Sequence, residues 1–277
     1  MTGTTRQNVQ QRYKRMLELQ EEQRYLEGLM YQIRDDHPGL GALKMYSLLR
    51  PGRMGRDRFV AFYRESGFCL RQRPNFRRTT DSSGVIRFPN LVEGKKLTTV
   101  NQVWVSDITY YEMVGSFYYL TFIVDLFSRK IVGYSLGKRL LTRETTIPAL
   151  EMALKGRVIA HKIIFHSDGG GQYYSKDFLE RTAGLFISSM GYSVYENAYA
   201  ERVNGIIKNE YIRHWQPKSF PKLAKCVEMA VKNYNNKRPH RSLGNRTPDQ
   251  VYQAYRQRQE LPKEQLTRKN ENIFLST

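Results

Sequence analysis

One polar stripe late in the chain has the residue types of a phosphate-handling site. If residues 197–211 form a helix, four polar side chains share one face: Asn197, Glu201, Asn204 and Lys208. Three apolar residues are expected to form a separate stripe that packs against a sheet: Tyr199, Val203 and Ile206. A carboxylate on a rigid helix, with a cation two turns further along the same face, suits a metal ion and a phosphodiester.

A metal site at Glu201 needs further carboxylates, because a lone Glu binds Mg²⁺ poorly. Two are available at predicted strands, Asp107 within Trp104–Tyr110 and Asp168 just after Ile163–His166. Three acids in a basic chain repel one another unless cations occupy the site. The set therefore favours two Mg²⁺ ions, with Mn²⁺ as a substitute. These would activate a water or a 3′-hydroxyl for in-line phosphoryl transfer.

Each acid also has a purely structural interpretation. A lone Asp at a strand end is usually a turn or cap residue, and a lone Glu on a helix is usually a solvated side chain. Asp125, in the segment Asp125–Arg129, is expected to order a hairpin turn in this way. Composition and spacing alone do not separate Asp107 from Asp125.

The charge of the chain points to a polyanionic partner. Its 277 residues carry a formal net charge of +19, and the sequence pI is about 9.9. A basic body around a few clustered carboxylates is the pattern expected of an enzyme that acts on nucleic acid. The alternatives are an ordinary basic surface or a ribosome-associated protein.

Cysteines and hydropathy exclude other classes. Cys69 and Cys226 have no second Cys or His at zinc-ligand spacing, so no zinc module or disulfide framework is predicted. The polar start of the chain and the lack of a long apolar run predict a cytoplasmic protein without membrane contact.

The N-terminal part is predicted to be helical. A helix is expected over 7–34, packed onto the next module rather than forming a coiled-coil dimer, because its heptad run is short. Its apolar stripe is Leu17, Leu26, Leu29, Met30 and Ile33. Beyond a break at 35–41, helices are expected over 42–49 and 55–66. Their inward residues are Leu43, Tyr46, Leu48, Leu49, Phe59, Val60, Phe62 and Tyr63.

These two short helices with a tight turn and a basic exit describe a helix-turn-helix-like unit. Arginines make this unit and the basic linker over 71–96 candidates for phosphate contact: Arg53, Arg56, Arg58, Arg64, Arg71, Arg73, Arg77 and Arg78. The alternative is a small helical domain with a solvated basic face. Basic extended linkers are often ordered only on their partner.

The core is predicted to be an α/β domain with a mixed five-stranded sheet flanked by helices. Strands are expected over 103–110, 117–124, 130–135, 163–166 and 186–189. Helices are expected over 143–155, 175–183 and 197–211. The first three strands should form an antiparallel meander. The 143–155 helix is expected to bury Ile147, Leu150, Met152 and Leu154.

Two more helices, over 220–236 and 247–257, and a loosely ordered tail over 261–277 complete the chain. The predicted organisation is an N-terminal helix (1–36), a helix-turn-helix-like module (37–73), a basic linker (74–97), a catalytic core (98–214) and a helical extension (215–277).

Five ordered motifs resemble those of a known family. They are Trp104–Tyr110 (WVSDITY), Val124–Gly133 (VDLFSRKIVG), His166–Tyr173 (HSDGGGQY), Asn197–Glu201 (NAYAE) and Tyr234–Gly244 (YNNKRPHRSLG). The chain is similar from about His37 to Tyr255 to the OrfB product of two-frame bacterial insertion sequences. These are DDE transposases whose core resembles retroviral integrase and the RNase H fold.

The resemblance implies a catalytic triad, matched here by Asp107, Asp168 and Glu201. It implies that Lys208 contacts the terminal DNA of the element, and that Gly41–Arg71 is a helix-turn-helix. DNA contacts are also expected from Asn197, Asn204 and the arginines named above. The Asp168–Glu201 interval is shorter than the family usually has. The shortening falls in 191–196, and a loop deletion there can leave the triad intact.

The implied partners are double-stranded DNA, as terminal inverted repeats and as target, and OrfA as a frameshift fusion or a separate chain. A homodimer or larger assembly on DNA is expected, in the bacterial cytoplasm at the nucleoid. One alternative is a DNA-binding regulatory OrfB protein that is inactive without OrfA. A second is an RNase H-type or Holliday-junction nuclease on the same fold. The 234–244 motif counts against the nuclease.

Overall fold

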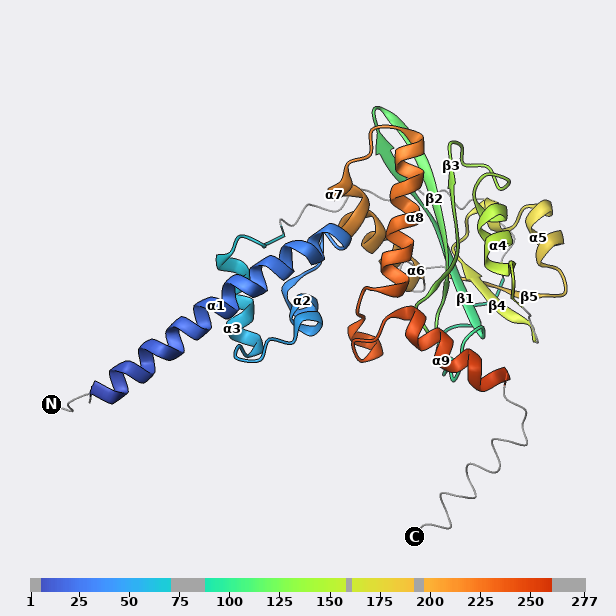
Figure 1. The fold of residues 1–277 in the computed structure, drawn as a ribbon. Helices are drawn as coiled ribbons and strands as arrows, with labels where there is room; N and C mark the ends of the chain where they lie inside the picture. Colours follow the sequence, from blue (N-terminus) through green and yellow to red (C-terminus); the bar gives the residue numbers. More distant parts are fainter. Residues whose placement is uncertain (1–5, 71–87, 158–160, 192–196, 261–277) are drawn as a thin grey trace, which may run out of the picture. The chain divides into compact units, whose positions relative to one another are not determined.

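The computed structural model describes residues 6–70, 88–157, 161–191 and 197–260, without the side chains of residues 257–260. The chain divides into two units, Met1–Phe76 and Arg77–Thr277, and each has its own core (Figure 1). Most of the expected linker, most of the shortened 191–196 loop and the tail from 261 lie outside the described residues. In the described part of the chain, no helix is both long enough and apolar enough to cross a membrane.

The first unit consists of three helices, α1 (Arg6–Asp36), α2 (Ala42–Leu49) and α3 (Arg56–Glu65). They enclose a core of buried apolar side chains: Leu26, Met30, Leu40, Met45, Met54, Phe59, Phe62, Tyr63 and Phe68. The C-terminal half of α1 supplies Leu26 and Met30, so α1 packs onto the short helices as predicted.

Three residues expected to face inward are exposed instead. Leu17, Leu43 and Leu48 are 41%, 52% and 40% exposed. Leu17 lies in the part of α1 that precedes its contact with the core. In α2 the inward face consists of Met45 and, partly buried beside it, Ala42, Tyr46 and Leu49, and because successive helical residues turn by about 100°, Leu43 and Leu48 fall outside this face.

The second unit is built on a five-stranded mixed sheet, as predicted. Its strands are β1 (Val103–Met113), β2 (Ser116–Asp125), β3 (Ile131–Gly137), β4 (Ile163–Ser167) and β5 (Phe186–Met190). The order across the sheet is β3-β2-β1-β4-β5. The first three strands form the antiparallel meander, and β4 and β5 continue it in parallel with β1.

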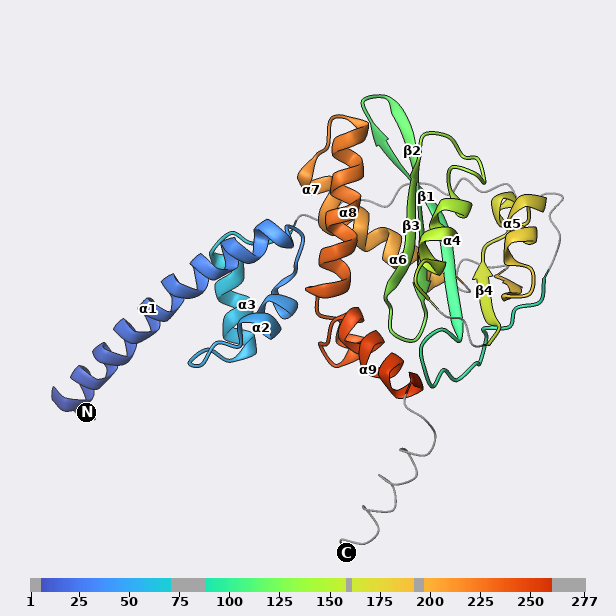
Figure 2. The same ribbon diagram turned by 45° about the vertical axis from the view of Figure 1, so that its right-hand side comes forward.

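Helices cover both faces of this sheet (Figures 1 and 2). One face packs α6 (Ala198–Ile206), a π-helical segment (Ile207–Ile212) and α8 (Phe220–Asn236) against Val103 and Val105. The short α7 (Arg213–Trp215) links the last two.

The other face packs α4 (Thr146–Leu154), α5 (Lys176–Thr182) and α9 (Pro248–Glu260). Trp104 of β1 joins this second core, because neighbouring residues of a strand point to opposite faces of the sheet. The helix expected over 143–155 begins only at Thr146, after a turn.

Close packing of α4 on β3 depends on small residues. A Cβ at Gly133 would lie 2.2 Å from the carbonyl oxygen of Ala149 and 2.8 Å from the backbone nitrogen of Ala153. Ala149 and Ala153 are fully buried at this contact, while Met152, expected to be buried, is 41% exposed. The helix therefore presents its alanines to the strand, which rotates Met152 toward solvent.

Replacing Gly133 by Ala should destabilise the second unit by at least about 2 kcal/mol, because the added methyl would overlap the backbone of α4. Urea unfolding followed by circular dichroism measures this change. Gly171→Ala is the matched control, since a Cβ there meets nothing within 4 Å, and its effect should stay within about 0.5 kcal/mol. Equal stability of the two variants would contradict the packing argument.

Candidate active site

Strand pairing brings Asp107 and Asp168 together. β1 and β4 run parallel, and the last pair of their register is Ser106 with Ser167. Asp107 is the next residue on β1, and Asp168 follows the last residue of β4. Because parallel strands keep their register, the residues that follow this last pair, Asp107 and Asp168, fall next to each other.

The Asp107 carboxyl group is the electrostatic centre of the site. Burial, together with the negative charges of Asp168 and Glu201, raises its pKa to about 7. The backbone N–H of Ile108 and the side-chain amide of Asn204 oppose this shift, and Asn204 Nδ2 donates to Asp107 Oδ2 over 2.7 Å. All three predicted acids therefore act on one small region.

Asp168 is held by the turn that follows β4. Its Oδ1 accepts from the backbone N–H of Gly170 over 3.2 Å. A Cβ at Gly170 would lie 3.0 Å from that same oxygen, so the turn approaches the carboxylate closely. The carbonyl oxygen of Asp168 accepts from the hydroxyls of Tyr174 (3.1 Å) and Ser167 (3.2 Å). Burial also raises the pKa of Asp168.

The predicted polar stripe lies against β1. Asn197 Nδ2 donates to the carbonyl oxygen of Ser106 over 3.0 Å. Lys208 Nζ donates to Thr109 Oγ1 over 2.6 Å and lies 3.4 Å from the carbonyl oxygen of Tyr110. With Asn204 bound to Asp107, three members of the stripe follow β1 through the site. Burial lowers the pKa of Lys208.

The expected apolar stripe is wrong at Tyr199, whereas Ile206 packs against the core as expected. Val203 is buried, but Tyr199 is 48% exposed and stacks under the Arg129 guanidinium, whose carbon is 3.9 Å from the ring centroid. The apolar residues that α6 and the π-helical segment bury are Ala200, Val203, Ile207, Tyr211 and Ile212. They share the inward face with Asn197 and Asn204, because the asparagine amides find partners on β1 and can therefore be buried.

Glu201 lies on the first turn of α6, and its side chain is exposed. Among the described residues, no three His, Cys, Asp or Glu side chains are arranged to hold one metal ion. The donor chemistry nevertheless fits divalent cations. The acids repel one another at Asp107, a cost that a bound cation would remove. The Oδ1 atoms of Asn197 and Asn204 are buried at the same site without a hydrogen-bond partner.

Comparison with protein families gives two adjoining matches. Residues 98–188 and 187–248 each match a model described as "Integrase core domain". Together these models span more than half of the chain.

The similar proteins are encoded by insertion elements. A 31 kDa protein of insertion element IS600 from Shigella sonnei is 34% identical over 210 residues, which cover 74% of this chain and 77% of that protein. The chain belongs to the IS3 family of insertion-sequence transposases.

The matches to two other members of the family span a smaller share of those proteins. The transposase for IS629 from Shigella sonnei is 37% identical, over 56% of this chain and 53% of that protein. Transposase InsF for IS3A from Escherichia coli K12 is 33% identical, over 54% and 53%. A solved structure of the HTLV-2 integrase catalytic core domain in complex with magnesium is 25% identical, covers 55% of this chain and 96% of that chain, and has a TM-score of 0.45.

The residues predicted to contact DNA differ in their exposure and in their contacts. Arg53, Arg56 and Arg58 are exposed, with Arg53 paired to Glu18 and Arg56 to its neighbour Asp57. The remaining linker predictions lie outside the described residues: Arg71, Arg73, Arg77 and Arg78. Asn197 and Asn204 are each only 4% exposed, and in this structure their amides donate to Ser106 and Asp107 of β1.

The residues beneath the acids were not foreseen. Tyr173 is buried, and its hydroxyl pairs with Ser106 Oγ over 2.8 Å. Burial and the charges of Asp107 and Asp168 raise its pKa well above the usual value. The sequence signal was available, because two tyrosines follow Asp168 closely in the transposase motif, but only the fold shows that they turn back beneath it.

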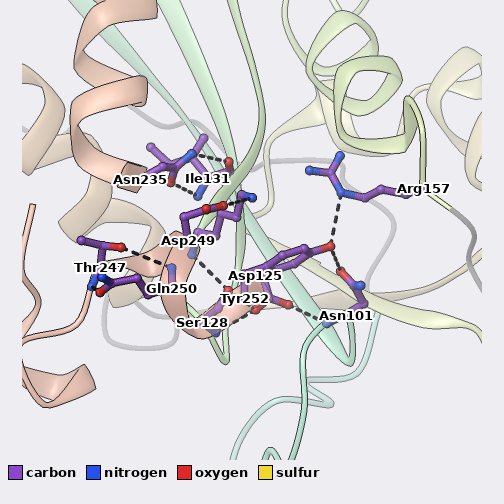
Figure 3. A network of polar contacts seen from close by, with 11 residues as sticks. Asn101, Asp125, Ser128, Ile131, Arg157, Asn235, Thr247, Asp249, Gln250 and Tyr252 are labelled. Atoms are coloured by element: carbon purple, nitrogen blue, oxygen red, sulfur yellow. Dashed lines mark hydrogen bonds and ion pairs between the residues drawn. The ribbon is translucent and has the colours of Figure 1, made fainter. Parts of the chain in front are cut away.

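Asp125 plays the structural part predicted for it. Its side chain is fully buried and accepts from the backbone N–H groups of Ser128 and Asn101, each over 2.7 Å (Figure 3). Asn101 Oδ1 in turn accepts from the Trp104 indole and the Tyr252 hydroxyl, each over 3.1 Å. Asp125 thus fastens the β2–β3 turn to the start of β1 and to α9.

The C-terminal motif of the transposase is also structural here. Asn235 uses its amide as a backbone group would, accepting from the N–H of Ile131 and donating to its carbonyl, each over 2.9 Å (Figure 3). Tyr234 donates its hydroxyl to the carbonyl oxygen of Arg129 over 3.0 Å. Arg238 forms a bidentate ion pair with Glu210 at 2.7 and 2.8 Å. The motif therefore fastens α8 to β3 and to the π-helical segment.

Neutralising Asp107 should change how stability depends on pH. The folded-state pKa of about 7 exceeds the unfolded value of 3.8. Protonation therefore favours the folded state, and this contribution is lost as pH rises through about 7. In EDTA at pH 8, Asp107→Asn should be more stable than the wild type by on the order of 1–3 kcal/mol, with no such gain near pH 4. Thermal unfolding of both proteins between pH 4 and pH 8 measures this difference. If the stabilities of the variant and the wild type changed in parallel with pH, the raised pKa of Asp107 would be contradicted.

Asp125→Asn should behave in the opposite way. The new NH₂ group would confront N–H donors that now bind a carboxylate, so we expect a loss of roughly 2–4 kcal/mol at neutral pH. Chemical unfolding of Asp125→Asn and Asp107→Asn in EDTA distinguishes an acid that stabilises the fold from an acid that is destabilised by neighbouring carboxylates. Unchanged stability of Asp125→Asn would remove the structural role from Asp125.

Proposed function

We propose that this transposase cleaves a DNA strand at each end of its insertion element and joins the freed 3′-hydroxyl to target DNA. Asp107, Asp168 and Glu201 would be the catalytic residues. The observation that carries this proposal is the parallel β1–β4 pairing, which sets Asp107 beside Asp168 where the charge of Glu201 also acts. Membership of a transposase family with an integrase core supports the same reaction.

The acids would hold two Mg²⁺ ions, for which Mn²⁺ can substitute. When bound, these ions would polarise the scissile phosphate and stabilise the attacking and leaving oxygens. Asp107, Asp168 and Glu201 would be the residues that hold these ions. Since Glu201 is exposed at the start of α6, we expect a change of its side-chain rotamer to complete the set. Asn204 donates to Asp107 Oδ2 and so holds the carboxyl group in its orientation.

The DNA would be held by basic side chains around the candidate active site. Lys208 already lies on the active-site face, and its ammonium would exchange Thr109 for a phosphate oxygen. In this proposal residues 98–214 are the catalytic core and 37–73 the DNA-binding module, with exposed Arg58 free to contact phosphate. Terminal inverted repeats and target DNA are the substrates, OrfA the fused or separate partner, and a dimer or larger assembly the active form at the bacterial nucleoid.

The decisive experiment uses the element's own ends. Wild-type protein, alone and fused to any upstream reading frame, would be incubated with Mg²⁺ and DNA carrying the flanking inverted repeats. Gel analysis detects strand cleavage and 3′-end joining. Asp168→Asn should lower both rates by at least about 1,000-fold, since the lost interaction is made with the transition state. DNA binding should persist.

Asp177→Asn is the matched control, because Asp177 is an exposed acid on the nearby α5. It should keep wild-type activity. Equal activity of Asp168→Asn and wild type would refute the proposed triad. DNA binding without cleavage by any protein, fused or not, would instead indicate a regulatory DNA-binding role.

A further inference from the structure

Residues Phe88–Leu91 lie along the outer strand of the catalytic sheet. Backbone N–H of Met190, the last residue of β5, donates to the carbonyl oxygen of Pro89 over 3.4 Å. Backbone N–H of Leu91 donates to Ser189 Oγ over 2.9 Å. Because β5 is the edge of the sheet, this segment covers backbone groups that would otherwise be open to another strand. We call Phe88–Leu91 the strap.

The strap contacts the Asp168 turn through an aromatic pair. The rings of Phe88 and Tyr174 are stacked, with centroids 5.3 Å apart and an interplanar angle of 21°. The Tyr174 hydroxyl donates to the carbonyl oxygen of Asp168 and pairs with Ser167 Oγ, each over 3.1 Å. A tyrosine hydroxyl is fixed in position once its ring is fixed. The stack therefore determines where this donor meets the Asp168 peptide.

A second path runs from the strap to β4 itself. Ser189 Oγ, which accepts from Leu91, also pairs with His166 Nδ1 over 2.9 Å. His166 is fully buried on β4, two residues before Asp168. The strap is thus joined to the strand that ends at Asp168 as well as to the turn that follows it.

The Asp168 turn needs such support because of its composition. Gly169, Gly170 and Gly171 follow the carboxylate directly, and glycine restricts the backbone less than any other residue. The bond from Gly170 to Asp168 Oδ1 lies within the turn, so it moves with the turn. The Tyr174 hydroxyl comes from beyond the glycines, and Phe88 comes from a distant part of the chain.

We propose that Phe88 is a positioning residue of the transposase, which aims the Asp168 carboxylate at the divalent cations by fixing Tyr174. This inference rests on the proposed function for the identity of the reaction, but it concerns how tightly the site binds its cation. Loosening the stack spreads Asp168 over several orientations, so cation binding weakens while the DNA-binding surface is unchanged.

The test compares Phe88→Ala and Tyr174→Phe with the wild type in two assays. Tyr174→Phe keeps the ring and removes the hydroxyl, so it remains informative if Phe88→Ala folds poorly. Mn²⁺ binding followed by electron paramagnetic resonance should show affinity about tenfold lower in both variants, as for other supports of metal ligands. The Mg²⁺ concentration for half-maximal strand joining should rise similarly, with KM for DNA unchanged. Phe88→Trp, which keeps an aromatic face, should restore both.

Val92→Ala is the matched control, since Val92 also packs against the core just beyond the strap but takes no part in the stack. It should leave Mn²⁺ affinity at the wild-type level. Folded Phe88→Ala and Tyr174→Phe proteins with wild-type Mn²⁺ affinity would overturn the inference. A wild-type protein that binds Mn²⁺ through Asp168 but never cleaves or joins DNA would refute the proposed function and leave the positioning role standing.

Discussion

Repulsion among three carboxylates is the constraint on which the arrangement of the second unit depends. Parallel pairing of β1 with β4 forces Asp107 beside Asp168, and α6 adds the charge of Glu201. In a protein whose net charge is +19, these acids could have been spread among basic partners. Their concentration where β1 passes the end of β4 costs stability that an oxygen-binding cation can return. Burial, and after it the charges of Asp168 and Glu201, raise the pKa of Asp107.

The residues of α6 and its N-cap that face the acids from the protein interior are asparagine amides and not basic side chains. Asn197 and Asn204 are buried against β1 and donate to Ser106 and Asp107, which orients the site without neutralising it. The π-helical segment that follows carries Lys208 to Thr109, so the cation reaches β1 beyond the carboxylates. Since π-helical turns are often found at functional sites, this local change of helix geometry belongs with the placement of Lys208.

Structural support reaches the site from both ends of the unit. Asp125 and Asn235 fasten the β2–β3 turn and β3 to the C-terminal helices, so the meander that carries Asp107 is held at its far edge (Figure 3). The strap performs the corresponding task at the β5 edge, next to Asp168. The strands β1 and β4, which position Asp107 and Asp168, lie between these two anchors. The 234–244 motif contributes to this support through Tyr234, Asn235 and Arg238.

Local sequence patterns predicted the element order, the mixed sheet and the helical first unit, and contiguous motifs predicted the three candidate acids. Hydrophobic period and turn residues are local properties, and the motifs are contiguous. The sequence by itself did not determine which side chains α6 buries, nor that Met152, Leu43 and Leu48 are exposed. Those outcomes depend on which neighbour each helix face meets: β1 offers backbone partners to asparagines, and Gly133 draws the alanines of α4 inward. The strap could not be predicted from the sequence either, because Phe88 and Tyr174 are far apart in the chain. They come together only because the strap lies along β5, the edge strand of the sheet.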